Sequence, residues 1–187
     1  MSKLWICILI LQTILSSSYV TAHDINSNKI TLIMREKTHV SLIMSINLLK
    51  AMNLILAPQI KYADFILTFS NMDPKLFQKE YEKTKIKISS GIILLSKDQN
   101  KLPTREWKWP LASVLQSQCQ VFVMELMTGN HDHSKEPILE VSTEIIDKTD
   151  KSSIQIQVLK EIQPVLLISY KPVTNWGSET RPTSIEF

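Results

Sequence analysis

The chain has 187 residues, of which 44% are hydrophobic and 21% are charged. A length of this order fits one domain with a sizeable core and hardly fits two. The 21 basic residues nearly balance the 18 acidic ones, so the composition gives no broad electrostatic footprint for nucleic acid or an anionic membrane, and we expect no nucleic-acid partner.

Residues 1–22 have the pattern of an export signal. Lys3 supplies a short positive region, residues 4–15 form an apolar run, and small or polar residues follow as far as Ala22. The run is shorter than the roughly 20 residues that a membrane-spanning helix needs. We therefore expect cleavage between Ala22 and His23, a periplasmic or secreted protein, and no transmembrane segment in the mature chain.

The number of cysteines gives further information about the cellular compartment of the protein. Cys7 would leave with the signal, so Cys119 would be the only cysteine of the mature chain and an internal disulfide is impossible. The chain also lacks an N-x-S/T sequon. This composition is more typical of a bacterial periplasm than of a eukaryotic secretory pathway. Cys119 itself is expected to be a small buried hydrophobe rather than a nucleophile.

The amino-terminal half of the mature chain is predicted to contain mainly strands. Residues 29–35 have a strand pattern. Residues 38–48 fit a strand, and Leu42, Ile46, Leu49 and Met52 also have helical spacing. We favour a strand that runs into a helical or irregular turn near residues 49–53. Residues 63–70 and 85–96 also favour strands. This half therefore contributes at least four strands.

A short helix is predicted between the last two of these strands. Asp73 can cap its start, and Pro74 suits the first helical position. Leu76, Phe77 and Tyr81 lie toward one side of the helix, which predicts a buried face there.

The carboxyl-terminal half is predicted to be all strand and loop. Ile154, Ile156 and Val158 alternate with polar residues and give the clearest strand pattern. The four expected strands are residues 118–127, 138–146, 153–159 and 164–170. Short polar loops between them favour an antiparallel meander.

Together these elements predict a mainly β fold. Seven or eight short strands with one or two short helices are typical of a single-domain antiparallel β-sandwich, which we place at residues 23–177. Residues 178–187 are polar and contain a proline, so we expect a flexible carboxyl-terminal tail.

Several catalytic patterns are absent from the sequence. With three glycines in the whole chain, it has no glycine-rich loop to hold phosphates and no G-x-S-x-G nucleophile elbow. Glu140 and Glu144 are expected on the solvated side of a strand rather than as a glycosidase pair. His39, on a predicted strand, is expected to be an ordinary surface or core-edge residue.

The remaining histidines allow a metal site. His131 and His133 stand two residues apart in a predicted loop, so both imidazoles can face the same way and bind Cu²⁺ or Zn²⁺. Cleavage before His23 would add a free α-amine beside its imidazole. This arrangement resembles the amino-terminal histidine brace of certain exported copper proteins. The alternative, which we favour, is a solvated loop and a frayed terminus.

The segment REWKWP, residues 105–110, contains an aromatic pair. In an extended chain Trp107 and Trp109 share one face, with Lys108 opposite. Such a pair can stack on a sugar or anchor a protein partner. The alternative, which we favour, is that both rings fill the core. If either ring were exposed, the surface around it would be the best candidate for an interface.

These patterns favour an exported, non-enzymatic domain that binds another protein. It could serve as a cell-envelope or secretion-apparatus accessory factor, with strand edges and the Trp107 and Trp109 region as its contact surface. The alternative is a copper or zinc protein that uses His23, His131 and His133. A hydrolase with scattered active-site residues is the third candidate.

Overall fold

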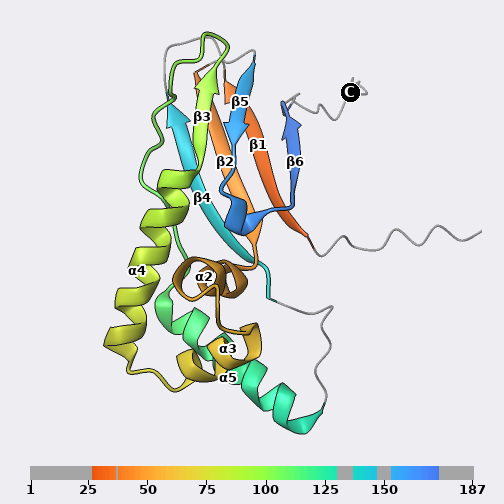
Figure 1. Ribbon diagram of the computed structural model, residues 1–187. Coiled ribbons are helices and arrows are strands. Elements are labelled where there is room, and N and C mark those ends of the chain that lie inside the picture. The colour runs from red at the N-terminus through yellow and green to blue at the C-terminus, as the bar shows by residue number, and fades with distance from the viewer. Residues whose placement is uncertain (1–26, 37, 130–136, 147–152, 173–187) are drawn as a thin grey trace, which may run out of the picture.

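A four-stranded mixed sheet forms the centre of the protein (Figure 1). The structure is a computed structural model that describes residues 27–36, 38–129, 137–146 and 153–172. The sheet has the order β4-β2-β1-β6, and β2 pairs antiparallel with both of its neighbours, whereas β6 pairs parallel with β1. Its strands are β1 (Asn28–Glu36), β2 (His39–Ile46), β4 (Leu139–Ile146) and β6 (Val165–Tyr170).

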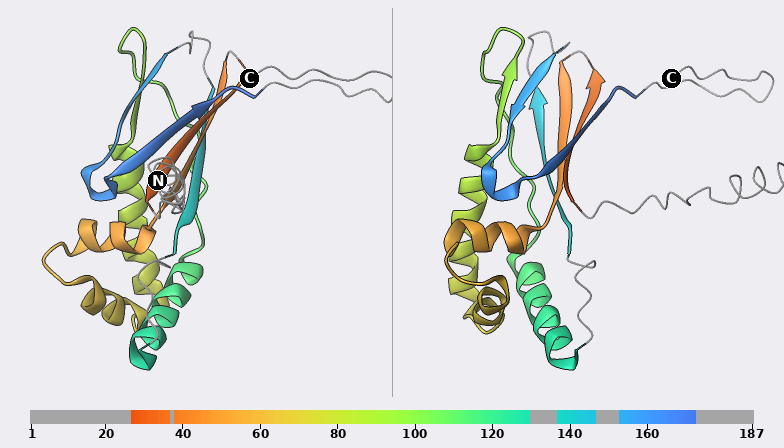
Figure 2. Two further views of the ribbon diagram at one scale, coloured as in Figure 1. Left: turned by 90° about the vertical axis from the view of Figure 1, so that its right-hand side faces the viewer. Right: turned by 45° about the vertical axis from the view of Figure 1, so that its right-hand side comes forward.

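Helices and a small second sheet complete the described fold. An antiparallel pair, β3 with β5, forms the second sheet. These elements are α2 (Leu48–Leu56), α3 (Tyr62–Ser70), α4 (Pro74–Gly91), β3 (Ile93–Ser96), α5 (Ala112–Thr128), β5 (Ile154–Gln157) and the 3-10 turn η2 (Lys160–Ile162). The helix α4 and the β3–β5 pair lie over one face of the large sheet, and α2, α3 and α5 gather at one end, which we call the helical end (Figures 1 and 2).

The core lies between the large sheet and these covering elements. The side chains of β2 that point inward, Val40, Leu42, Met44 and Ile46, are each no more than 1% exposed. They alternate with residues of the opposite face, as the two-residue period of a strand requires. This sheet face is called the inner face below, and its counterpart the outer face.

The chain passes from β2 into α2 through a single residue, Asn47. Its side chain accepts a hydrogen bond from the Lys50 N–H at 2.9 Å and so caps the helix. Its own N–H donates to Asn28 Oδ1 at 2.8 Å, and Asn28 Nδ2 donates to the Ile162 carbonyl at 2.7 Å. Asn28 thus joins β1, the start of α2 and η2.

Aromatic rings connect the helices. Phe65 stacks on Phe69 with ring centroids 4.0 Å apart, and Phe69 meets Phe77 of α4 edge to face at 5.9 Å. Aromatic pairs in such arrangements add to the stabilisation that comes from burial alone. The helix α4 begins as predicted at Pro74. The Asp73 side chain accepts hydrogen bonds from the backbone N–H groups of Lys75 and Leu76.

The predicted β-sandwich is wrong. Residues 63–70 and 118–127, expected to be strands, belong to the helices α3 and α5, and helices hold more of the described residues than strands do. Residues 85–96 form the end of α4 and the short β3. The predicted antiparallel meander is wrong too, because β4, β5 and β6 pair with β2, β3 and β1 rather than with one another.

Residues 63–70 and 118–127 were mistaken for strands because they have apolar residues on every side. In such a segment the two-residue period of a strand can be matched by chance. The buried residues of α3 include Phe65, Ile66 and Phe69, and those of α5 are Leu115, Cys119 and Phe122. Both sets have helical spacing. The remaining strand predictions agree with β1, β2, β4, β5 and β6. Within the described residues, no helix is long and apolar enough to cross a membrane.

Substitution of Asn28 by alanine should lower the free energy of unfolding by about 1–3 kcal/mol, because it leaves the Asn47 N–H and the Ile162 carbonyl without their partner. Urea denaturation followed by circular dichroism measures this change. Asn100→Ala, at an exposed loop position, is the matched control and should change stability by less than about 0.5 kcal/mol. Equal unfolding midpoints for the two variants would show that the Asn28 junction does not stabilise the fold.

Candidate functional site

The predicted metal ligands His23, His131 and His133 lie outside the described residues, so the copper or zinc site stays a prediction. Among the residues that are described, no group of three or more His, Cys, Asp or Glu side chains is placed to hold a metal ion.

The tryptophan pair lies on the core side of the segment that carries it. Trp107 and Trp109 are partly buried and pack against the core, with ring centroids 5.9 Å apart. Trp109 also meets the buried Tyr81 edge to face at 6.4 Å. Both rings therefore have a packing role, and their use as an interaction surface stays a prediction.

The backbone of the same segment pairs with the free edge of β4. The Arg105 N–H donates to the Glu144 carbonyl at 2.8 Å, and Lys108 and Ser142 exchange two backbone hydrogen bonds of 2.8 and 3.1 Å. The segment thus extends the sheet by one irregular strand. The indoles turn toward the core, whereas the charged side chains of the same segment, Arg105, Glu106 and Lys108, line a groove on the outer face.

These charged side chains line an open groove of about 540 Å³ on the outer face, which we call the outer-face groove. Its floor comes from Ser41 and Ile43 on β2 and Ser142 on β4. Its charged lining residues are Arg35, Arg105, Lys108, Glu106, Glu140 and Glu144. Among the described residues these six form no ion pair with one another.

Ser41 lies in the middle of this face. It pairs directly with Glu144 across the β2–β4 ladder, and it is only 5% exposed. Its Oγ is enclosed and has no hydrogen-bond partner. His39, two residues earlier on the same side of β2, places Nε2 3.6 Å from Glu144 Oε2.

Ser41, His39 and Glu144 are the residue types of an acyl-transfer triad, but their geometry differs from one. A catalytic serine hydroxyl is activated through a hydrogen bond to the imidazole base. Ser41 Oγ makes no such bond. The arrangement therefore offers hydrogen-bonding and charged groups for binding rather than an activated nucleophile.

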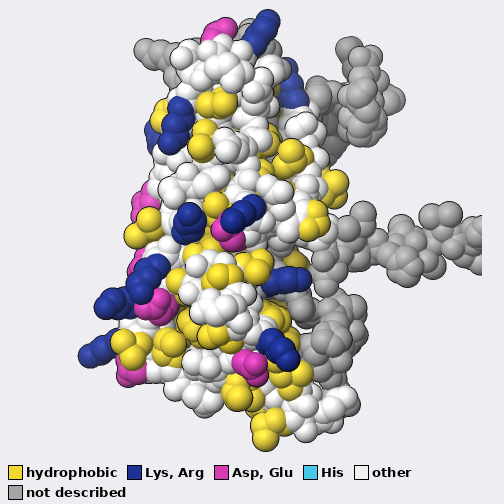
Figure 3. Space-filling model, in the orientation of Figure 1, with side chains coloured by type: hydrophobic (Ala, Val, Ile, Leu, Met, Phe, Trp, Pro, Cys, Tyr) yellow, Lys and Arg dark blue, Asp and Glu magenta, His cyan; other side chains and the backbone are white. Residues whose placement is uncertain are grey.

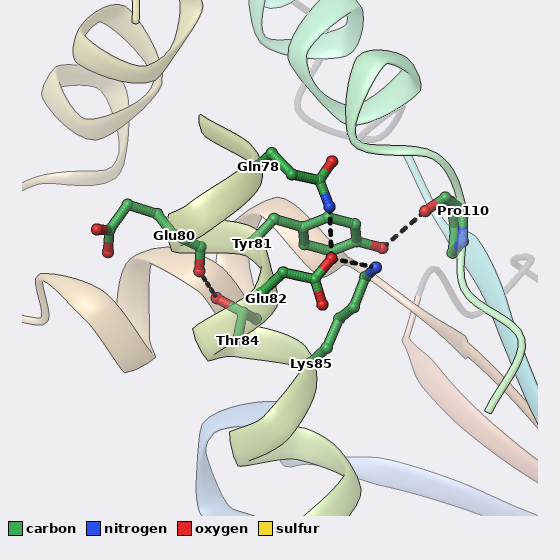
Figure 4. A network of polar contacts seen from close by, with 7 residues as sticks. All are labelled: Gln78, Glu80, Tyr81, Glu82, Thr84, Lys85 and Pro110. Atoms are coloured by element: carbon green, nitrogen blue, oxygen red, sulfur yellow. Dashed lines mark hydrogen bonds and ion pairs between the residues drawn. The ribbon is translucent and has the colours of Figure 1, made fainter. Parts of the chain in front are cut away.

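Two buried titratable groups also have structural roles. Tyr81 donates its hydroxyl to the Pro110 carbonyl at 3.1 Å, and Lys85 lies over its ring while pairing with Glu82 (Figure 4). Burial, and to a smaller extent the charge of Glu82, raises the pKa of Tyr81. Burial likewise raises the pKa of Cys119 to about 12, which keeps this thiol protonated and unreactive.

The helix α5 has an apolar outer side. Its solvent-facing residues include Met127, Met124, Val121 and Val114, with exposures of 83%, 66%, 54% and 42%. We call these four residues the α5 surface. The helix contains a single charged residue, Glu125, whereas the exposed side of a helix is usually polar. A shallow hollow on this side is lined by Ser113, Ser117 and Gln118 between two of the valines.

The α5 surface belongs to the helical end of the molecule, and hydrophobic side chains gather over that end in Figure 3. Leu67 of α3, which is 52% exposed, adds to them, and α3 packs against α5. Sequence reasoning missed this surface because residues 118–127 were interpreted as a strand. The single charge in a helix-length segment was the signal that could have revealed it.

The strand β6 is the other exposed apolar element. Among the described strands it pairs only with β1, and its sequence VLLISY contains no charged residue. Leu167 and Tyr170 are each about half exposed. An uncharged edge of this kind is open to pairing with a further strand. The use of strand edges as a contact surface stays a prediction.

No protein-family model matches the chain, and neither a curated protein nor a solved structure was found to be similar to it.

Cys119 should be almost inert to a thiol reagent in the folded protein. A pKa near 12 lowers the thiolate fraction by about a thousandfold relative to an ordinary cysteine. The Cys7→Ser variant isolates this thiol, and its reaction with a chromogenic disulfide can be compared in buffer and in denaturing urea. Similar rates under the two conditions would contradict the burial described here.

Proposed function

We propose that this protein is exported and binds another protein through the α5 surface, without catalysing a reaction. The observation that carries the proposal is the exposure of Val121, Met124 and Met127 on a helix with one charged residue. Contiguous exposed apolar patches commonly mark sites of protein interaction.

The size and chemistry of the surface fit this function. Full burial of a valine or methionine side chain is worth about 1.5–3 kcal/mol, and a partner that covers the α5 surface gains the part of this that corresponds to the area still exposed. Methionine is flexible and polarizable, and it adapts to the shape of an apposed surface. A few well-packed side chains at the centre of an interface usually supply most of the binding energy.

Export rests on residues 1–22, which have the charged start, apolar run and small-residue end of a signal sequence. The partner would accordingly be a protein of the periplasm, the cell envelope or the extracellular space. A role as an envelope or secretion-apparatus accessory factor fits this placement. Two candidate nucleophiles support the non-catalytic interpretation, since Ser41 Oγ has no hydrogen bond to a base and burial keeps Cys119 protonated.

Val121→Lys should weaken partner binding by tenfold or more, because it places a charge in an apolar contact. A tenfold change corresponds to about 1.4 kcal/mol of binding free energy. The full chain, tagged and expressed in the organism that makes it, is cross-linked and purified, and the recovered proteins are quantified by mass spectrometry. We expect one partner to be enriched with the unmodified chain and depleted with the variant.

Ile86→Lys on α4 is the matched control. Ile86 is 68% exposed, comparable to the α5 residues, but it lies between Lys85 and Lys87 and outside the α5 surface. It should leave partner recovery unchanged. Equal loss in both variants, undiminished recovery with Val121→Lys, or recovery of this chain with copies of itself alone would contradict the proposal.

A further inference from the structure

We propose that the outer-face groove is a second binding site, for a small zwitterion of the short-peptide class that carries both an ammonium and a carboxylate group. The residues that line the groove stand on β1, β2, β4 and residues 105–108, whereas α5 lies at the helical end (Figures 1 and 2). The two sites are therefore separate, and this inference does not rest on the proposed function.

The charges of the groove favour a ligand of both signs. Three basic and three acidic side chains line it, and within the described chain none of the six pairs with another. Opposite charges attract and like charges repel at short range, although solvent weakens both effects at an open surface. A simple anion would be attracted by one set and repelled by the other, whereas a zwitterion can satisfy both.

The spacing of the strands sets the length of this ligand. Glu140 and Glu144 stand on β4 and Arg35 on β1, with β2 between them. Two strand spacings of about 4.8 Å separate the strand of Glu144 from that of Arg35, whereas Arg105 and Lys108 lie next to β4 itself. An extended tripeptide covers about 10 Å, at 3.3–3.6 Å per residue. Its ammonium end would meet Glu144, which is paired with Ser41 across the β2–β4 ladder, and its carboxylate end would meet Arg35.

Ser41 supplies a second, independent observation. It lies on the floor of the groove between these two sides, is 5% exposed, and its Oγ has no hydrogen-bond partner. An enclosed hydroxyl without a partner is unfavourable, because it has lost its hydrogen bonds to water and gained none in exchange. A peptide carbonyl or carboxylate that crosses β2 can accept its hydrogen bond once the flexible side chains above it rotate. Binding would thus satisfy a group that the free protein leaves unpaired.

The test uses the full chain and four forms of one probe: triglycine, its N-acetyl derivative, its carboxyl-terminal amide, and the doubly blocked peptide. Affinities come from amide chemical shifts during titration. Triglycine should bind most tightly, and each block should weaken binding by about tenfold or more, equivalent to about 1.4 kcal/mol. Equal affinities for all four forms, tighter binding of a blocked form, or no shifts with triglycine would overturn the proposal.

Two variants assign the ends of the ligand. Glu144→Gln should abolish the difference between triglycine and its N-acetyl form, and Arg35→Gln the difference between triglycine and its amide. Because Glu144 also approaches His39, Arg35→Gln on β1 carries the test alone if the first variant fails to fold. Retention of the full differences in the folded variants would count against these roles.

Lys79→Gln, at an exposed position of α4 outside the groove, is the matched charge control and should bind all four probes as the unmodified chain does. Val121→Lys should do so as well. Unchanged binding of the probes by Val121→Lys would show that the groove and the α5 surface act independently. The peptide-binding proposal and the protein-binding proposal can therefore fail separately.

Discussion

The inner face of β2 is the constraint on which the rest of the structure depends. Four alternating side chains of one central strand, from Val40 to Ile46, are almost wholly removed from water, and such burial is the main favourable contribution to folding. Antiparallel partners on both sides extend this apolar face. The single residue Asn47 then turns the chain directly into α2, which directs the following helices toward the end of the sheet and its inner side.

This one-sided burial leaves two kinds of exposed surface. The outer face of the sheet carries alternating residues that need not be apolar, and there Ser41 and the charged side chains around it form a groove. At the helical end, α5 buries Leu115, Cys119 and Phe122 on one side. Nothing in the described chain covers its other side, although that side is apolar as well. The first surface is suited to polar ligands and the second to a protein.

Local signals in the sequence predicted several elements correctly. Asp73 and Pro74 marked the start of α4, because capping and the fixed φ of proline act within a few residues. Alternation around Ile154 and Ile156 identified β5. The same reasoning failed for α3 and α5, whose apolar residues fit both periods, and tertiary packing decided in favour of helix. The pairing of β6 with β1, far apart in the chain, has no local signal.

The residues of the candidate sites show the same limit of prediction from sequence. Glu140 and Glu144 were expected on the solvated side of a strand, and both line the outer-face groove. Trp107 and Trp109 were expected to fill the core, and both pack against it. The assembly of the groove depends on backbone pairing between Lys108 and Ser142, a contact between residues that no sequence motif connects. The importance of Ser41 arises only from burial without a hydrogen-bond partner, which a sequence does not reveal.

Site-specific photo-cross-linking in living cells tests the central claim most directly. A photoreactive amino acid replaces Met124 on the α5 surface in one strain and Ile86 on α4 in another, two positions of nearly equal exposure at 66% and 68%. The account predicts a discrete adduct with one other exported protein from position 124 and none from position 86. The same adducts from both positions, or none from position 124, would contradict it.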